Sequence, residues 1–186
     1  MKKMRYPTIF HFISTEFEKA KIAYILIGGF AVNYYGVTRQ TADVDFLITR
    51  EDFSKALKLL KSAGYKQGLT QEVFARLEDS KSYLMDVDFM FVDEETLRQI
   101  IKDGKKIKIA GKRFIVPSLN HLIALKLHSL KFNPKIREFK DFPDIINLLR
   151  INKINVRTDQ FRNLCLKYGT KELYYRILKN VEGDIS

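Results

Sequence analysis

The spacing of apolar residues predicts a chain that alternates helices and strands over its first two thirds. Apolar positions recur at helical intervals in some segments, and elsewhere they form short alternating or continuous runs bounded by glycine and polar residues. The first pattern predicts helices at residues 8–20, 30–36, 51–64 and 93–102. The second predicts strands at residues 22–27, 43–48, 73–77 and 83–91, and a hairpin of residues 105–109 and 113–116 around Ala110-Gly111.

After Pro117 the pattern is helical only. It predicts helices at residues 118–129, 139–150, 158–168 and 170–180. Residues 131–140 are rich in lysine and are expected to connect two of these helices, and Pro143 is expected in the first turn of the next helix. We therefore expect an α+β fold, with a mixed sheet flanked by helices in residues 1–116 and a helical C-terminal region in residues 117–186 packed on this core.

Composition narrows the class of protein. The chain has 186 residues, 46% of them hydrophobic, which is enough for a core in one domain, or in one domain with a small appendage. Its single cysteine, Cys165, excludes an internal disulfide and a cysteine-based zinc site. No apolar run approaches the ~18–20 residues that span a membrane, and the first residues lack a signal-peptide core. We expect a cytoplasmic protein without a membrane partner.

The charge of the chain indicates a class of partner. The formal net charge is +11 and the isoelectric point is near 9.6. Clustered lysines and arginines attract phosphates and release counterions from nucleic acids. A nucleic acid is therefore the expected partner or substrate, although a lysine-rich proteome also produces basic proteins.

Two predicted strands carry carboxylates at alternate positions. Asp43 and Asp45 share one face of the strand at residues 43–48 and lie roughly 7 Å apart along it. Asp86 and Asp88 repeat this arrangement in the strand at residues 83–91. Like charges this close repel unless a cation lies between them, and Mg²⁺ prefers carboxylate oxygens. The alternative is that these strands lie at a sheet edge, where the acids face water or pair with lysines.

At this point the sequence resembles a known family. The segment GGFAVNYYGVTRQTADVDFLI, residues 28–48, resembles the signature of the polymerase-beta-like nucleotidyltransferase superfamily. It is most similar to small prokaryotic members, which include minimal transferases and the nucleotidyltransferase toxins of toxin–antitoxin systems. The segments VPSLNHLIALKLHSL and REFKDFPDIINLL, residues 116–130 and 137–149, are similar to a helix pair in the same proteins.

The resemblance implies a metal site. Asp43 and Asp45 would bind Mg²⁺, and Asp88 would be the third carboxylate, acting as metal ligand and general base. Asp86 is the alternative third carboxylate. Gly29 stands where many superfamily members have serine, which removes one hydroxyl contact to phosphate.

The resemblance also implies a site for the NTP substrate. Gly28 and Gly29 would form the turn under the triphosphate, with their amides facing phosphate. Arg39 and Thr41 match a motif that would orient phosphate or fix the loop. Lys126 matches a lysine that lies near the triphosphate in the family.

The function expected from these observations is Mg²⁺-dependent transfer of a nucleoside monophosphate from an NTP to an acceptor hydroxyl. The charge favours RNA as acceptor, with tRNA as the best candidate, and a toxin role with an antitoxin partner is consistent with the resemblance. The alternatives are transfer to a protein or a small molecule, and a non-catalytic nucleic-acid binding module with the same fold.

Overall fold

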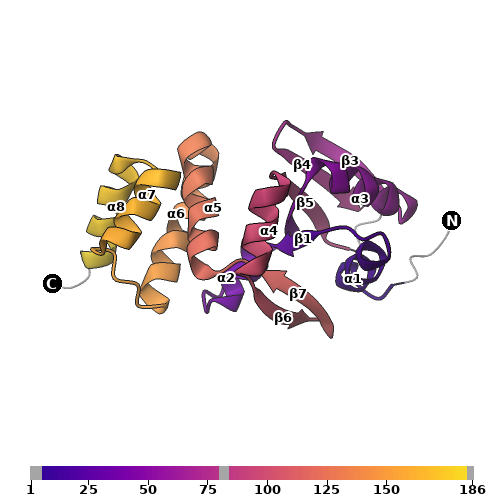
Figure 1. Ribbon diagram of the computed structural model, residues 1–186, viewed down its shortest axis with the longest axis horizontal. Helices are drawn as coiled ribbons and strands as arrows, with labels where there is room; N and C mark the ends of the chain where they lie inside the picture. Colours follow the sequence, from indigo (N-terminus) through magenta and orange to yellow (C-terminus); the bar gives the residue numbers. More distant parts are fainter. Residues whose placement is uncertain (1–5, 80–83, 184–186) are drawn as a thin grey trace. The chain divides into compact units, whose positions relative to one another are not determined.

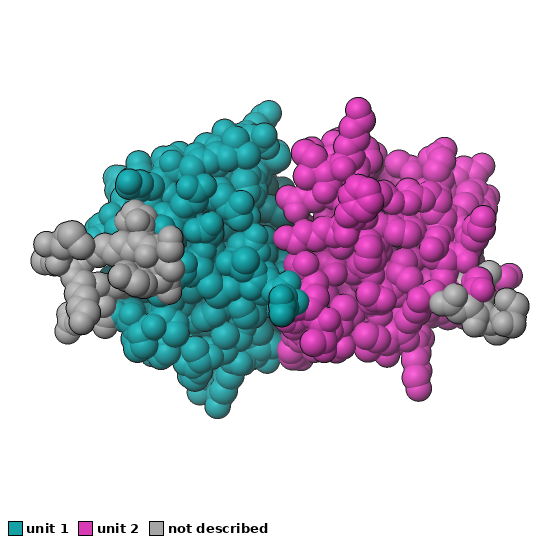
Figure 2. Space-filling model, turned by 180° about the vertical axis from the view of Figure 1, so that it is seen from behind, with its two compact units in different colours: residues 1–31, 40–118 teal, residues 32–39, 119–186 magenta. Residues whose placement is uncertain are grey.

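The protein forms two compact units. The computed structural model describes residues 6–79 and 84–183. Unit 1 comprises residues 1–31 and 40–118, and unit 2 comprises residues 32–39 and 119–186 (Figure 2). The chain passes from unit 1 to unit 2 within helix α2 (Gly28–Tyr34), returns after Arg39, and enters unit 2 again after Ser118.

Unit 1 is built around a five-stranded mixed sheet (Figure 1). The strand order is β1-β2-β5-β4-β3, in which β2 and β5 are parallel and all other neighbours are antiparallel. The strands are β1 (Tyr24–Leu26), β2 (Asp43–Ile48), β3 (Tyr65–Thr70), β4 (Phe74–Asp79) and β5 (Asp86–Phe91). The mixed sheet with flanking helices confirms the predicted α+β fold.

Capping side chains and turn residues fix the ends of the other elements of unit 1. Thr8, Thr49 and Asp93 each accept a hydrogen bond from a backbone N–H in the first turn of a helix. Ala110 and Gly111 both have positive φ, as a tight hairpin turn requires. These elements are α1 (Ile9–Lys19), α3 (Arg50–Ser62), α4 (Glu94–Lys102), β6 (Lys105–Ile109) and β7 (Lys112–Val116).

An aromatic cluster forms the core of unit 1. The rings of Phe46 on β2 and Phe89 on β5 are stacked with centroids 5.9 Å apart. Phe17 of α1 lies 6.4 Å from Phe89, and Phe114 of β7 lies 6.5 Å from Phe46. Alternation along β2 and β5 places these rings on one face of the sheet and the aspartates on the other.

Unit 2 is mainly helical, and its short segment of residues 32–39 begins with the end of α2. Its helices are α5 (Leu119–Phe132), α6 (Pro134–Ile151), α7 (Asp159–Tyr168) and α8 (Lys171–Glu182). The side chains that fill its interior are mostly apolar and come from all four helices: Leu122, Ile123, Leu127, Ile145, Leu148, Leu149, Phe161, Cys165, Leu173 and Ile177. None of the helices in the described part of the chain is both long and apolar enough to cross a bilayer.

The structure differs from the expected elements in three places, at β3, at the start of α6 and at the start of β5. Strand β3 was not predicted, because YKQGLT is polar and occupies an exposed sheet edge. The expected connection at residues 131–140 is largely helical, since α6 already begins at Pro134, whose missing N–H costs nothing there. Pro143 consequently lies in the interior of α6 rather than in its first turn. The expected strand at residues 83–91 begins at Asp86, and residue 83 lies outside the described residues.

Candidate functional site

Three aspartates converge on the face of the sheet opposite the aromatic core. In the parallel pair of β2 and β5, Asp43 is opposite Asp86 and Asp45 is opposite Asp88. Oxygen atoms of Asp43, Asp45 and Asp88 all lie within 4.8 Å of one another. Three carboxylates at this spacing can hold a divalent metal ion, because hard cations take several carboxylate oxygens.

Asp88 is the most enclosed of the three acids, with 8% of its surface exposed. Burial, opposed by Arg76 and reinforced by Asp45 and Asp43, raises the pKa of Asp88 from its ordinary 3.8 to about 6. Without a bound cation, this carboxylate therefore holds its proton more readily than an exposed aspartate does.

Arg76 completes the cluster, and no sequence motif indicated it as a site residue. It lies opposite Asp88 in the antiparallel pair of β4 and β5. Its Nη2 donates to Asp43 Oδ2 at 3.2 Å, and its Nε lies 3.0 Å from Asp88 Oδ1. The only available signal was its alternation with buried Ala75 and Leu77, which assigns Arg76 to a face only once the strand order is known.

The predicted residues beside the acids make specific contacts. Gly28 has φ +61, and a Cβ placed on it would lie 1.9 Å from Asp45 Oδ2. The close approach of the backbone to Asp45 thus requires glycine at this position. Thr41 Oγ1 lies 3.0 Å from Asp43 Oδ1 and donates to the carbonyl of Asp43, so it holds one of the three clustered aspartates in place.

Asp86, the alternative third carboxylate, is used differently. Its Oδ1 accepts a hydrogen bond from the backbone N–H of Asp79 at 3.2 Å, between the adjacent strands β5 and β4. The structure therefore brings Asp88, and not Asp86, together with Asp43 and Asp45.

Gly29 follows Gly28 in α2 and belongs to unit 1, whereas Arg39 and Lys126 belong to unit 2. Lys126 is buried on α5, and its Nζ donates to Asp141 Oδ1 at 2.8 Å and to Asp144 Oδ2 at 2.7 Å, both on α6. Arg39 Nε lies 3.7 Å from the same Asp144 oxygen. Asn33 holds Arg39 in place through its side-chain amide, which bonds both the N–H and the carbonyl of Arg39 at 3.0 Å. Sequence reasoning missed Asn33 because no pattern pairs it with Arg39.

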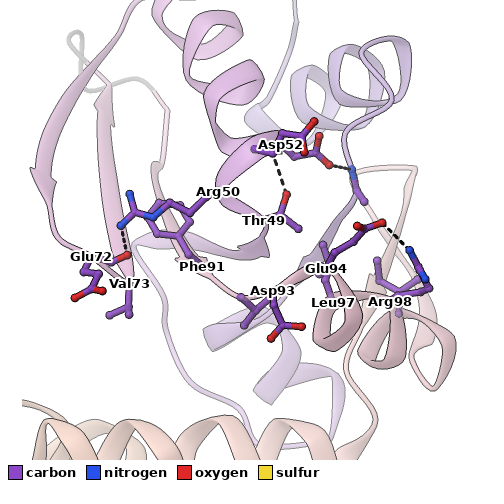
Figure 3. A pocket seen from close by; sticks show the side chains of 14 residues that line it. Thr49, Arg50, Asp52, Glu72, Val73, Phe91, Asp93, Glu94, Leu97 and Arg98 are labelled. Carbon is purple, nitrogen blue, oxygen red and sulfur yellow. Dashed lines mark hydrogen bonds and ion pairs between the residues drawn. The ribbon is translucent and has the colours of Figure 1, made fainter.

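A cleft of about 760 Å³ lies at the other end of the two parallel strands (Figure 3). Its lining includes Thr49 and Arg50, which follow β2, and Val92 and Asp93, which follow β5. The aspartate cluster lies nearer the beginning of these strands. The cleft is therefore separate from the aspartates.

Several solved structures share the fold of this chain. The solution structure of the antibiotic-resistance factor ANT(2″)-Ia has a TM-score of 0.61 at 15% identity, covering 94% of this chain and 95% of that one. An antigenic nucleotidyltransferase-like protein from Paracoccidioides brasiliensis has a TM-score of 0.53 at 16% identity, covering 92% and 84%. The lincosamide antibiotic adenylyltransferase LnuA, bound to lincomycin, has a TM-score of 0.51 at 19% identity, covering 75% and 94%. At these identities, the likeness shows the fold.

A search of curated proteins finds no match to the sequence. A family model described as "uncharacterised nucleotidyltransferase" matches residues 2–182. That match spans nearly the whole chain, and the protein therefore belongs to this family of nucleotidyltransferases.

Proposed function

We propose that the protein uses Mg²⁺ to transfer a nucleoside monophosphate from an NTP to an acceptor hydroxyl on RNA. The observation that carries this proposal is the convergence of oxygens from Asp43, Asp45 and Asp88 within 4.8 Å in a chain that belongs to a nucleotidyltransferase family. Strand pairing fixes all three acids, so the donor set is largely formed in advance.

The donor set suits Mg²⁺. All three candidate ligands are carboxylates, which hard cations prefer over nitrogen or sulfur donors. Asp88 Oδ1 is buried and is ion-paired with Arg76, whose Nε lies 3.0 Å away. Bound Mg²⁺ would supply charge neutralisation for the attacking and leaving oxygens of an in-line displacement.

In the proposed reaction one bond to phosphorus forms and one breaks. The acceptor hydroxyl oxygen forms a bond to the α-phosphorus of the NTP, and the bond from that phosphorus to the bridging oxygen breaks, releasing pyrophosphate. The hydroxyl proton passes to Asp88.

Neighbouring residues would support the reacting groups. Thr41 orients Asp43, and Arg76 offsets part of the negative charge that Asp43 and Asp88 place on one face. Gly28 and Gly29 would offer backbone amides to the triphosphate. For Arg39 and Lys126 we retain the phosphate-binding role that the family resemblance implies.

RNA is the proposed acceptor because of the charge of the molecule. A net charge of +11 favours a polyanion over the cationic drugs that antibiotic transferases accept. tRNA is the first acceptor to test. Modification of tRNA by a toxin, held in check by an antitoxin protein, is the biological role to examine next.

The proposal is tested by incubating the protein with each of four α-labelled NTPs, Mg²⁺ and total RNA, and separating the products on a gel. We expect label in an RNA band with the wild type, and none with Asp43→Asn or Asp45→Asn, whose side chains keep their shape but lose their charge. Label in protein or in a small-molecule fraction would instead assign a different acceptor. Absence of any labelled product, together with no heat of NTP binding in calorimetry, would refute nucleotidyl transfer.

A further inference from the structure

A group of exposed apolar side chains lies where α5 ends and α6 begins. Phe132 is 61% exposed, Ile136 is 78% exposed and Phe139 is 89% exposed. These three fall within eight consecutive residues and include two phenylalanines. Of the other large exposed apolar side chains of the described residues, Leu69 and Val73 lie four residues apart, and Tyr34, Ile151, Leu166 and Tyr175 stand singly. Exposed rings gathered in this way are typical of binding surfaces.

Packing within unit 2 does not explain these side chains. From Pro134 to Lys140, no residue of α6 is buried, and the buried residues of this helix begin at Asp141. The first turns of α6 therefore present their side chains to solvent. Lys135 and Phe139, and likewise Ile136 and Lys140, are four residues apart and so share one side of the helix.

The same stretch is strongly basic. Residues 131–140 contain four basic residues and one acidic residue, a net charge of +3. Glu138, the acidic one, is paired with Arg176 of α8. Among the described residues, Lys131, Lys135 and Lys140 have no carboxylate partner, and Lys131 Nζ lies 5.4 Å from the centre of the Phe132 ring.

We propose that this α5–α6 surface, formed by Phe132, Ile136 and Phe139 with Lys131, Lys135 and Lys140, binds single-stranded RNA. Single strands are recognised by aromatic rings that stack on bases and by cations that follow the phosphates, largely without regard to sequence. This surface offers both. The proposal rests on the proposed function, in which RNA is the acceptor, and names the surface that holds it.

A protein partner fits the surface less well. The centres of protein–protein interfaces are depleted in lysine, because each buried ammonium must lose its water. Here lysines flank each phenylalanine in the sequence, at positions 131, 135 and 140. Such lysines can neutralise the phosphates of a nucleic acid, which releases counterions and favours binding.

The test is fluorescence anisotropy of a labelled mixed-sequence 12-nucleotide RNA with the full chain, in EDTA and without NTP. We expect the wild type to bind the single strand more tightly than the matching duplex. Phe132→Ala with Phe139→Ala should weaken binding about 25-fold or more, since each stacked base contributes about fivefold or more. Leu166→Ala, which changes an exposed apolar residue of α7, is the matched control and should bind as the wild type does.

Substitutions that keep one property at a time identify the interaction. Phe132→Leu with Phe139→Leu keeps the apolar surface but removes the rings, and should lose as much affinity as the alanine pair. Phe132→Tyr with Phe139→Tyr keeps the rings and should bind within about threefold of the wild type. Changing the three lysines to alanine should lower the slope of log affinity against log salt by about 2, because about 0.7 is expected per phosphate contact.

Three outcomes would overturn the proposal. They are no binding of single-stranded RNA by the wild type, full binding by the leucine pair, and a wild-type dimer in sedimentation that the alanine pair dissociates, which would assign the surface to a second copy of the chain. Because the assay contains neither metal nor NTP, its result is independent of catalysis. Labelled RNA made equally well by the alanine pair would leave the proposed function standing, and RNA binding without any nucleotide transfer would leave the surface standing.

Discussion

The carboxylate of Asp88 differs from that of Asp86, although both point to the same face of β5. The first lies within the acidic cluster, and the second accepts the Asp79 amide. Asp86 and Asp88 are two positions apart on the same strand, so chemically identical side chains have different environments.

This difference predicts the behaviour of two matched variants. Asp88→Asn should lower the rate of nucleotide incorporation at least about 100-fold, because it removes a charged metal ligand and the proton acceptor. Asp86→Asn should stay within a few-fold of the wild type, since its amide oxygen can still accept from Asp79. The measurement is incorporation of labelled NTP at saturating Mg²⁺. The opposite ranking would move the third carboxylate to Asp86.

The raised pKa of Asp88 predicts a dependence of stability on pH in EDTA. The folded protein keeps a proton on Asp88 up to pH about 6, whereas the unfolded chain releases it near the ordinary value of 3.8. The unfolded state therefore binds fewer protons in this window, and the stability of the wild type falls as pH rises through it.

The asparagine in the Asp88→Asn variant cannot ionise, so this variant does not lose that stability as pH rises. The free energy of unfolding of the variant minus that of the wild type should increase by about 1 kcal/mol between pH 5 and pH 7.5. Urea denaturation at both pH values measures it, and taking the difference cancels other titrating groups. A difference that stays constant with pH would show that Asp88 ionises normally in the folded protein.

At the scale of elements, a buried group of charges joins α5 to α6. Lys126 with 6% of its surface exposed, Asp141 with 5% and Asp144 with 4% are among the few charged residues buried in the described part of the chain. Arg39 adds a second cation beside Asp144, so the group contains two positive and two negative charges. The charges of the group therefore cancel only while all four side chains are present.

Lys126→Met should destabilise the protein by about 3–5 kcal/mol, because it leaves two buried carboxylates without their main partner. Lys131→Met, on the same helix but exposed, should change stability by less than about 0.5 kcal/mol. Urea denaturation compares the two. If Lys126→Met were as stable as Lys131→Met, the buried ion pairs would contribute nothing to the folded state, and loss of activity in that variant would then point to phosphate contact.

At the scale of the whole molecule, ligand binding should raise the stability of the folded chain. A ligand that binds only the folded state stabilises it by about 2.7 kcal/mol at 100 times its dissociation constant. Mg²⁺ together with a non-hydrolysable NTP should therefore raise the melting temperature of the wild type by several degrees, and EDTA should reverse the rise. Asp43→Asn serves as the control, and an equal rise in that variant would place the ligand away from the aspartates.

The sequence alone determined most of the elements and the nature of the acidic cluster. Helical spacing, caps such as Thr49 and Asp93, and the alternation of Asp43 and Asp45 are local properties, written within a few residues of one another. The motif from Gly28 to Ile48 also led to the nucleotidyltransferases, the class of the family to which the chain belongs. Local patterns failed for β3 and for the start of α6. The polar sequence of β3 forms a strand because β4 provides its hydrogen bonds. The helix α6 begins earlier than its apolar spacing indicates, at Pro134.

Only the tertiary structure decided which side chains meet. The parallel register of β2 and β5 places Asp88 beside Asp45, and the antiparallel register of β4 and β5 places Arg76 opposite Asp88. The packing of α5 on α6 gives Lys126 its two carboxylate partners. These pairings join residues far apart in the chain, and a shift of one residue in strand register would turn the side chains to the other face. No pattern within a single element contains that information.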